Sequence, residues 1–294
     1  MNKQIVAFIQ YLKVERNYAQ NTQQAYSRDL NRLLVFLQKE GVDTWDHLQT
    51  DHLNLFVMNM RHKDISGRTI RRHLSSIRSF LTYLVDRDLL KSNCAISVHA
   101  PKIDKNLPKT LDYEQILQMI APTSDKWSEL RDVAILEVIY SCGLRVSELV
   151  NLDSNDIDMN EGFISVTGKG SKMRHTPIGD SAKKSIALYL QKIARNNALF
   201  INKNNGRISA RSVQNMIKKR ANNVGIKINV YPHMLRHAAA THFLQSSHDL
   251  RSVQEFLGHK SIKSTQVYTH LDFLELSKVY DKCHPRAKKH HHDV

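Results

Sequence analysis

Residues 100–111, with the sequence APKIDKNLPKTL, divide the chain into two parts and so limit the folds that it can adopt. Each of the two prolines disfavours helix at the residue before it, and three lysines with little apolar content are typical of a linker. A chain of 294 residues is long enough for two domains, each with a core of its own. We predict an N-terminal domain over 1–99, a linker over 100–109 and a second domain over 110–294.

The N-terminal part has the apolar period of a bundle of short helices. One predicted helix begins at Asn21 or Thr22 and ends at Gly41. Another begins near residues 66–68, and its apolar side chains recur at spacings of three and four, which is the helical period. These side chains are Ile70, Leu74, Ile77, Leu81 and Leu84.

The opposite face of this second helix is basic and contains no acid. Such a face is either simply solvated or lies against a DNA groove, where arginine reaches phosphates and base edges. We predict DNA binding because the face carries four arginines and no compensating carboxylate. They are Arg68, Arg71, Arg72 and Arg78.

The second part mixes helices with one hairpin. We predict a helix start at Thr110–Glu114, followed by helix through Trp127 to Leu152. The β-branched and aromatic run 163–167, a glycine-containing turn and a return strand ending at 176–178 predict a β-hairpin. The remainder, to Tyr280, is mostly helical in pattern. The predicted fold class is therefore mainly α, with a small β-sheet in the C-terminal domain.

The charge of the chain indicates an anionic partner. Lysine and arginine total 43 against 28 aspartate and glutamate, which gives a net charge of +15. Residues 181–248 contain no acid at all but carry twelve lysines and arginines, from Lys183 to Arg236. A solvated surface usually intersperses both signs, so we predict contact with the phosphate backbone of a nucleic acid.

Several other classes of protein are disfavoured. No apolar run approaches the roughly 18 residues of a membrane span, and the N-terminus lacks the features of a signal peptide. The three cysteines are far apart and predict neither a disulfide framework nor a zinc site. We therefore expect a cytoplasmic protein without contact to a membrane.

Four stretches of the second part carry reactive side chains: GLRVSEL (143–149), TGKGSK (167–172), PHMLRH (232–237) and LGHKSIKSTQVYTH (257–270). Taken singly, each has an ordinary structural interpretation. Arg145 could pair with Glu148, and Lys169 could be a turn residue between glycines. His233 and Arg236 could form a structural polar cluster. His259 could be the neighbour of a helix C-cap, and Tyr268 could be a half-buried aromatic.

Taken together, these side chains meet the needs of phosphodiester transfer without a metal. Two arginines can clamp the phosphate oxygens, and a lysine can protonate the leaving oxygen. Tyrosine, with a reference pKa near 10, needs basic or electrostatic help to act as a nucleophile. We find no carboxylate cluster for a two-metal nuclease and no GxxxxGK[ST] loop for ATP, so we expect no metal and no cofactor.

These residues, in this order, resemble the catalytic set of the tyrosine recombinases, the phage integrase family. The resemblance covers the whole chain, since NYAQNTQQAYSRDL (17–30) is similar to the start of that family's core-binding domain. It implies a helical core-binding domain and an α+β catalytic domain that close on DNA as a C-shaped clamp. It also implies Tyr268 as the nucleophile that forms a 3′-phosphotyrosyl bond. The other implied catalytic residues are Arg145, Lys169, His233, Arg236 and His259.

Within this family the chain resembles the Xer subgroup, and its XerC branch more than its XerD branch, because its end carries HPRA (284–287). One departure is visible: after His237 the family commonly has Ser-Phe, whereas this chain has Ala238-Ala239, which puts local packing in doubt. The resemblance implies resolution of chromosome dimers at cell division, a double-stranded recombination site and a second Xer-type recombinase in a heterotetramer on DNA. A septal DNA translocase is a further implied partner.

Three alternatives remain open at this stage: an accessory DNA-binding protein, a type IB topoisomerase and a mobile-element integrase. The tail is also open to two interpretations. Phe273–Tyr280 could pack on its own domain, but the resemblance implies docking into a neighbouring subunit.

Overall fold

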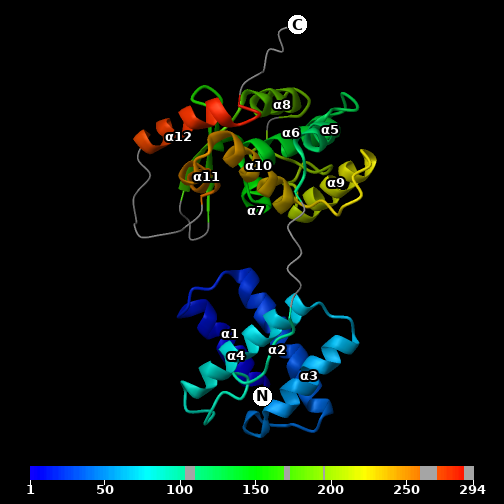
Figure 1. The fold of residues 1–294 in the computed structure, drawn as a ribbon, viewed down its shortest axis with the longest axis vertical. Helices are drawn as coiled ribbons and strands as arrows, with labels where there is room; N and C mark the ends of the chain where they lie inside the picture. The colour runs from blue at the N-terminus through cyan, green and yellow to red at the C-terminus, as the bar shows by residue number, and fades with distance from the viewer. Residues whose placement is uncertain (103–109, 169–172, 195, 259–269, 288–294) are drawn as a thin grey trace. The chain divides into compact units, whose positions relative to one another are not determined.

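The computed structural model describes the backbone of residues 1–102, 110–168, 173–194, 196–258 and 270–287, and the side chains of all of these except 270–275. The chain divides into two compact units, Met1–Leu107 and Pro108–Val294 (Figure 1). Most of the predicted linker lies outside the described residues, so its bounds stay a prediction.

The first unit is a helical bundle in which α2 contacts the other three helices. Its core is aromatic: Phe80 meets Phe8 edge-on at 5.3 Å between ring centroids and Trp45 at 4.8 Å. Such pairs add to the free energy gained from burial alone. The helices are α1 (Asn2–Val14), α2 (Gln20–Lys39), α3 (Thr50–His62) and α4 (Gly67–Val85), with a 3₁₀ turn at Trp45–His47.

Helix α4 confirms the pattern predicted from its sequence. Ser66 caps it, because its hydroxyl accepts a hydrogen bond from the backbone N–H of Thr69 at 3.3 Å. All five side chains of the predicted apolar stripe are buried. Since the stripe faces the core, the arginine-bearing face of α4 points away from it.

The second unit is built around a buried helix, α6, with α8 and α10 packed against it (Figure 1). Every residue from Val133 to Leu144 is buried, and most of them are apolar, as expected for a helix that is covered on all sides; Glu137 is the buried charge among them. No helix in the described parts of the chain is long and apolar enough to cross a membrane. The helices are α5 (Tyr113–Ile120), α6 (Trp127–Cys142), α7 (Val146–Val150), α8 (Asp180–Leu190), α9 (Ala210–Asn223), α10 (Pro232–Ser247), α11 (Leu250–Leu257) and α12 (His270–Cys283), with a 3₁₀ turn at Ser154–Asp156.

The single long helix predicted through Trp127 to Leu152 was wrong, because the segment contains separate helices. Helix α5 ends at Ile120, immediately before Ala121-Pro122, and proline disfavours helix in the residue before it. Helix α6 ends at Cys142, and the residue that caps it, Gly143, has a φ of +57°. That left-handed conformation is tolerated by glycine and typical of helix ends.

The predicted hairpin is confirmed and forms part of a small antiparallel sheet. Strand β2 (Phe163–Thr167) pairs with β3 (Met173–Pro177), with Val166 opposite Arg174. A two-residue strand, β1 (Ile157–Asp158), pairs with the other edge of β2 and was not predicted. The fold class predicted from the sequence, mainly α with a small sheet in the C-terminal part, is confirmed.

The tail from Leu276 to Ala287 packs on its own unit. The Tyr280 ring is buried and stacks on His284 at 4.7 Å between ring centroids. Arg286 forms an ion pair with the buried carboxylate of Glu137 on α6. The tail therefore belongs to the core of the second unit from Leu276 to Ala287, and docking into a neighbouring subunit stays a prediction.

Candidate active site

Arg145 lies in the turn between α6 and α7 and is not inside a helix, contrary to the sequence interpretation. Gly143 makes this turn possible for two reasons: its φ is positive, and a Cβ there would lie 2.7 Å from the Phe256 ring. Arg145 is then the N-cap residue of α7, with its side chain about one-third exposed. The turn thus presents a cation at the surface directly beside a tightly packed core.

Glu148 lies at the centre of three arginines. Its carboxylate accepts hydrogen bonds from the backbone N–H of Arg145 at 2.8 Å and from the Arg145 Nη1 at 2.7 Å. Arg174 of β3 donates both of its terminal nitrogens to the two Glu148 oxygens, each at 3.0 Å. Burial alone would raise the pKa of Glu148, but the bonds from Arg174 and Arg145 outweigh it and lower the pKa to about 2.

Arg236 is the third member of this cluster and is almost fully buried on α10. Its Nη1 donates to the Gly143 carbonyl, its Nη2 donates to the Leu257 carbonyl, and its Nη1 lies 3.7 Å from a Glu148 oxygen. Burial and the neighbouring Arg145 charge lower the pKa of Arg236 to about 10, which still leaves it protonated at neutral pH. Two of the predicted phosphate-binding cations therefore share one carboxylate.

His233 lies one helical turn before Arg236, at the start of α10, and its side chain is exposed. Three predicted catalytic residues, Lys169, His259 and Tyr268, lie outside the described residues. The structure thus brings together Arg145 and Arg236, with His233 on the helix that carries Arg236.

Sequence reasoning missed the role of two residues. It considered Glu148 only as an ion-pair partner of Arg145. The carboxylate of Glu148 also binds Arg174 and compensates the charge of Arg236. It overlooked Arg174 entirely, although a signal was present. Arg174 is directly opposite the buried Val166, so both side chains project from the same face of the sheet, and a buried cation requires a carboxylate partner.

Fewer cations of the basic stretch 181–248 are free of ion pairs than its sequence suggests. Acids from outside the stretch pair with three of its cations: Asp125 with Lys192, Asp153 with Arg207, and Glu129 with Arg220. Since Arg236 is also occupied, fewer of the twelve cations are available for the predicted contact with the phosphate backbone.

The four arginines of α4 have different surroundings. Arg78 donates to the carbonyls of Ala95 and Val98, which ties α4 to the segment that follows it. Arg72 pairs with the buried Asp29 of α2. Arg71 reaches the carbonyl of Pro101 at 3.3 Å, and Arg68 is exposed. The prediction that all four bind DNA is not tested by this geometry, but Arg78 has a structural role.

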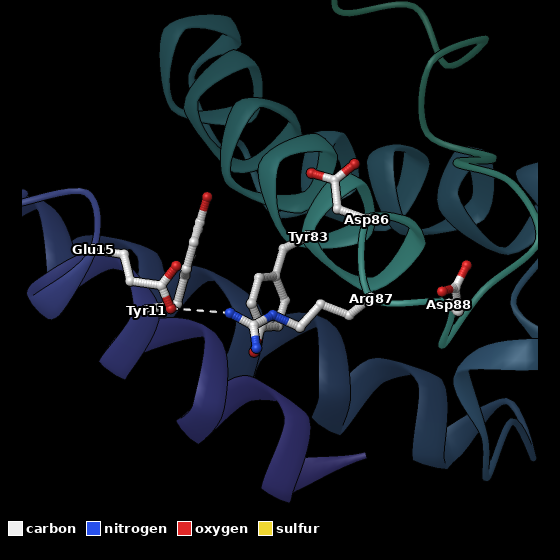
Figure 2. A pocket seen from close by; sticks show the side chains of 6 residues that line it. All are labelled: Tyr11, Glu15, Tyr83, Asp86, Arg87 and Asp88. Atoms are coloured by element: carbon white, nitrogen blue, oxygen red, sulfur yellow. Dashed lines mark hydrogen bonds and ion pairs between the residues drawn. The ribbon is translucent and has the colours of Figure 1, made fainter.

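A pocket of about 500 Å³ lies in the first unit and has the wrong charge for DNA (Figure 2). The Arg87 guanidinium lies over the Tyr83 ring at 5.0 Å and bonds to Glu15 at 3.0 Å. Asp86 and Asp88 also line the pocket, so three carboxylates surround a single cation that is already paired. Phosphate would be repelled there, and we assign no part of the active site to this pocket.

The part of the chain that the structure describes contains no group of three histidine, cysteine or carboxylate side chains placed to hold a metal ion. The cluster around Glu148 consists of guanidinium groups, which are ligands for oxyanions and not for metals.

Comparison with known proteins identifies the family. Residues 109–275 match the family model described as the phage integrase family, and residues 5–88 match that of the phage integrase N-terminal SAM-like domain. The tyrosine recombinase XerC of Alcanivorax borkumensis is 42% identical over 97% of this chain and 95% of its own. The XerC of Pseudomonas aeruginosa is 39% identical over 98% of this chain and 97% of its own.

Solved structures share the fold. A λ integrase (75–356) dimer bound to a COC′ core site matches with a TM-score of 0.72 and 16% identity, over 91% of this chain and 98% of that one. The XerH recombinase bound to palindromic difH matches with a TM-score of 0.68 and 21% identity, over 90% of this chain and 81% of that one. These solved structures confirm the predicted fold, and the family models and the XerC relatives confirm the resemblance noted from the sequence. The chain belongs to the phage integrase family and is a tyrosine recombinase.

Proposed function

We propose that this tyrosine recombinase breaks and rejoins DNA at a specific chromosomal site, using Tyr268 as its nucleophile. The tyrosine oxygen attacks the scissile phosphorus, a P–O bond to Tyr268 forms, and the bond from phosphorus to the 5′ oxygen breaks. His233 accepts the tyrosine proton and Lys169 protonates the departing 5′ oxygen. One phosphate ester replaces another, so a 5′-hydroxyl of the partner strand can reverse the step without ATP.

The observation that carries this proposal is the pair of cations held by Glu148. Arg145 lies in the turn before α7 and Arg236 lies on α10, but they share that carboxylate, and this shared contact fixes one guanidinium relative to the other. A preorganised pair of donors stabilises the charge that develops on a phosphate in the transition state. The partly exposed Arg145 is available to bind a phosphate oxygen, and His259 would be a further donor.

We extend the proposal to the biological role suggested by the relatives. Relatives that match along nearly the whole chain are named XerC. The proposed role is resolution of chromosome dimers in the cytoplasm at cell division. The chain would act with a second Xer-type recombinase in a heterotetramer on DNA, and with a septal DNA translocase as a further partner.

Covalent capture tests the proposal. A half-site duplex with a nick beside the scissile phosphate lets the cut fragment diffuse away, so the wild-type protein should accumulate an adduct that survives SDS. Tyr268→Phe should bind this DNA with nearly unchanged affinity, because phosphate contacts elsewhere dominate binding, but it should form no adduct. Tyr18→Phe, which alters a half-exposed tyrosine of the first unit, is the matched control. An SDS-resistant adduct with Tyr268→Phe would refute the assignment.

Two measurements separate the proposal from the alternatives within this chemistry. A type IB topoisomerase would relax supercoiled DNA without pairing two sites. A mobile-element integrase would recombine sites on an element other than the chromosomal one. Strand exchange between two chromosomal sites, without relaxation of plasmids that lack them, is the result expected here.

A further inference from the structure

Asp29 and Arg72 form an ion pair between α2 and α4 that the catalytic mechanism does not use. The Asp29 carboxylate is almost fully buried, whereas the Arg72 side chain is nearly half exposed. The Ser76 hydroxyl also lies 3.4 Å from Asp29, and His73 Nε2 lies 3.4 Å from its other oxygen. Donors from one turn of α4 therefore surround a single carboxylate of α2.

This pair fixes the direction of an exposed arginine. A free arginine side chain samples many rotamers and loses that freedom when it binds a ligand. In Arg72 the Nη1 is already held by Asp29, and the described residues provide no partner for its Nε or Nη2. The edge formed by Nε and Nη2 is thus left for a ligand, on a side chain that is already ordered.

The surroundings of the pair favour DNA. Helix α4 contains no acid, and the carboxylate that pairs with Arg72 is buried and compensated. Burial lowers the pKa of His73 and outweighs the charge of Asp29, which raises it; the charges of Arg72 and of Arg32 on α2 lower it further, so His73 is neutral at pH 7. Because both arginines act on the same histidine, two helices contribute positive charge to one patch.

The other arginines of the face are held differently. Arg78 is bound to two backbone carbonyls, and Arg71 reaches only one carbonyl at 3.3 Å. A contact with a phosphate tolerates such loosely placed cations. Recognition of a base edge requires the two parallel N–H donors of a guanidinium to be held in one orientation. Arg72 is the arginine of this face that a buried carboxylate orients.

We propose that Arg72 reads a guanine in the major groove of the recombination site, and that Asp29 is the positioning residue that aims it. Arginine donates two parallel bonds to the O6 and N7 of guanine, and the Nε–Nη2 edge has the required geometry. This inference rests on the proposed function only in taking the recombination site as the ligand.

Selection from a random library tests the inference without knowledge of the site. Full-length wild-type protein is mixed with duplexes that carry randomised positions, and the bound DNA is sequenced. We expect Arg72→Ala to lose the preference for guanine at one position, by roughly tenfold to a hundredfold, while the preferences elsewhere persist. Arg71→Ala, on the same face, should weaken binding to all sequences alike and reduce the salt dependence by about one phosphate contact.

Two further variants guard against misfolding and against a purely structural role. Arg72→Lys keeps the positive charge but loses the two parallel N–H donors of the guanidinium. DNA binding by this variant should therefore keep its salt dependence and lose its preference for guanine. Asp29→Asn should relax the preference at the same position, because the amide holds Arg72 less firmly.

Three results would overturn the inference. One is an unchanged guanine preference in both Arg72 variants. Another is an Asp29→Asn protein that binds every sequence more tightly with unaltered preferences, since Asp29 would then only neutralise charge. The third is a wild-type protein that selects no sequence. Covalent capture on the selected DNA is scored separately: selection without capture would refute the proposed nucleophile but leave the role of Arg72 standing.

Discussion

Replacing Glu148 by glutamine tests how strongly one carboxylate supports the site. The pKa of Glu148 is lowered from 4.5 to about 2, which corresponds to about 3 kcal/mol of favourable interaction with the ionised form. Glu148→Gln forfeits that interaction and leaves the charges of Arg145, Arg174 and Arg236 without their common partner. Loss of one partner from a buried ion pair has a similar cost, about 3–5 kcal/mol.

The expected effect on the melting temperature follows from the size of the second unit. For a unit of this size, about 3 kcal/mol corresponds to a decrease of roughly 6–12 °C. Trp127 lies in this unit and Trp45 lies in the other, so fluorescence in a Trp45→Phe background reports on the second unit alone. Glu161→Gln, which alters an exposed carboxylate of the same unit, is the control and should have the same melting temperature as the parent protein.

The pH dependence separates the charge of Glu148 from its shape. Because its folded pKa lies below the unfolded value of 4.5, its contribution to stability is complete above that value and is lost as the pH falls toward about 2. The difference between parent and Glu148→Gln should therefore be full at pH 7 and much smaller near pH 3. An equal difference at both pH values would show that packing, and not charge, causes the loss.

Three other predictions concern the site and the tail. Lys169→Ala should cleave a normal phosphodiester roughly 10²–10⁴-fold more slowly, but a 5′-bridging phosphorothiolate at close to the parent rate; equal defects on both would exclude an acid role. Deletion from Asp272 onward should lower the melting temperature of the second unit in calorimetry and weaken half-site binding, and an unchanged melt would contradict the packing described. In urea titrations, Gly143→Ala should lower the free energy of unfolding by more than the roughly 1–3 kcal/mol of backbone strain, because the new Cβ would clash with Phe256. Gly225→Ala is the control: its φ is also positive but the space around it is open, so it should show the cost of the strain alone.

Local patterns predicted the helices and the hairpin well where the local signals agree. In α4 a serine cap, an apolar stripe and a basic face all indicate the same helix, and the structure has it at Gly67–Val85. The segment after residue 110 was interpreted wrongly because its apolar content is nearly continuous. Pro122 and Gly143 were the signals that it breaks, and they should have outweighed hydrophobicity.

The ion pairs were not predictable from local patterns. Arg72 and Asp29 are 43 residues apart, and Arg174 and Glu148 are 26 apart, so only the tertiary fold brings them together. The sequence showed a helix face with four arginines and no acid, which is correct for α4 alone. It could not show that α2 supplies a buried carboxylate to one of the four.

The contact between Arg286 and Glu137 has a consequence for the order in which the chain folds during its synthesis. These residues are 149 apart, so the core of the second unit is incomplete until the ribosome has added the last turn of α12 and the residues after it. The first unit, by contrast, has all of its described helices by residue 85 and can fold while the rest is being made. A nascent chain would thus acquire its arginine-bearing helix face long before the core of the second unit, which carries the cluster around Glu148, is complete.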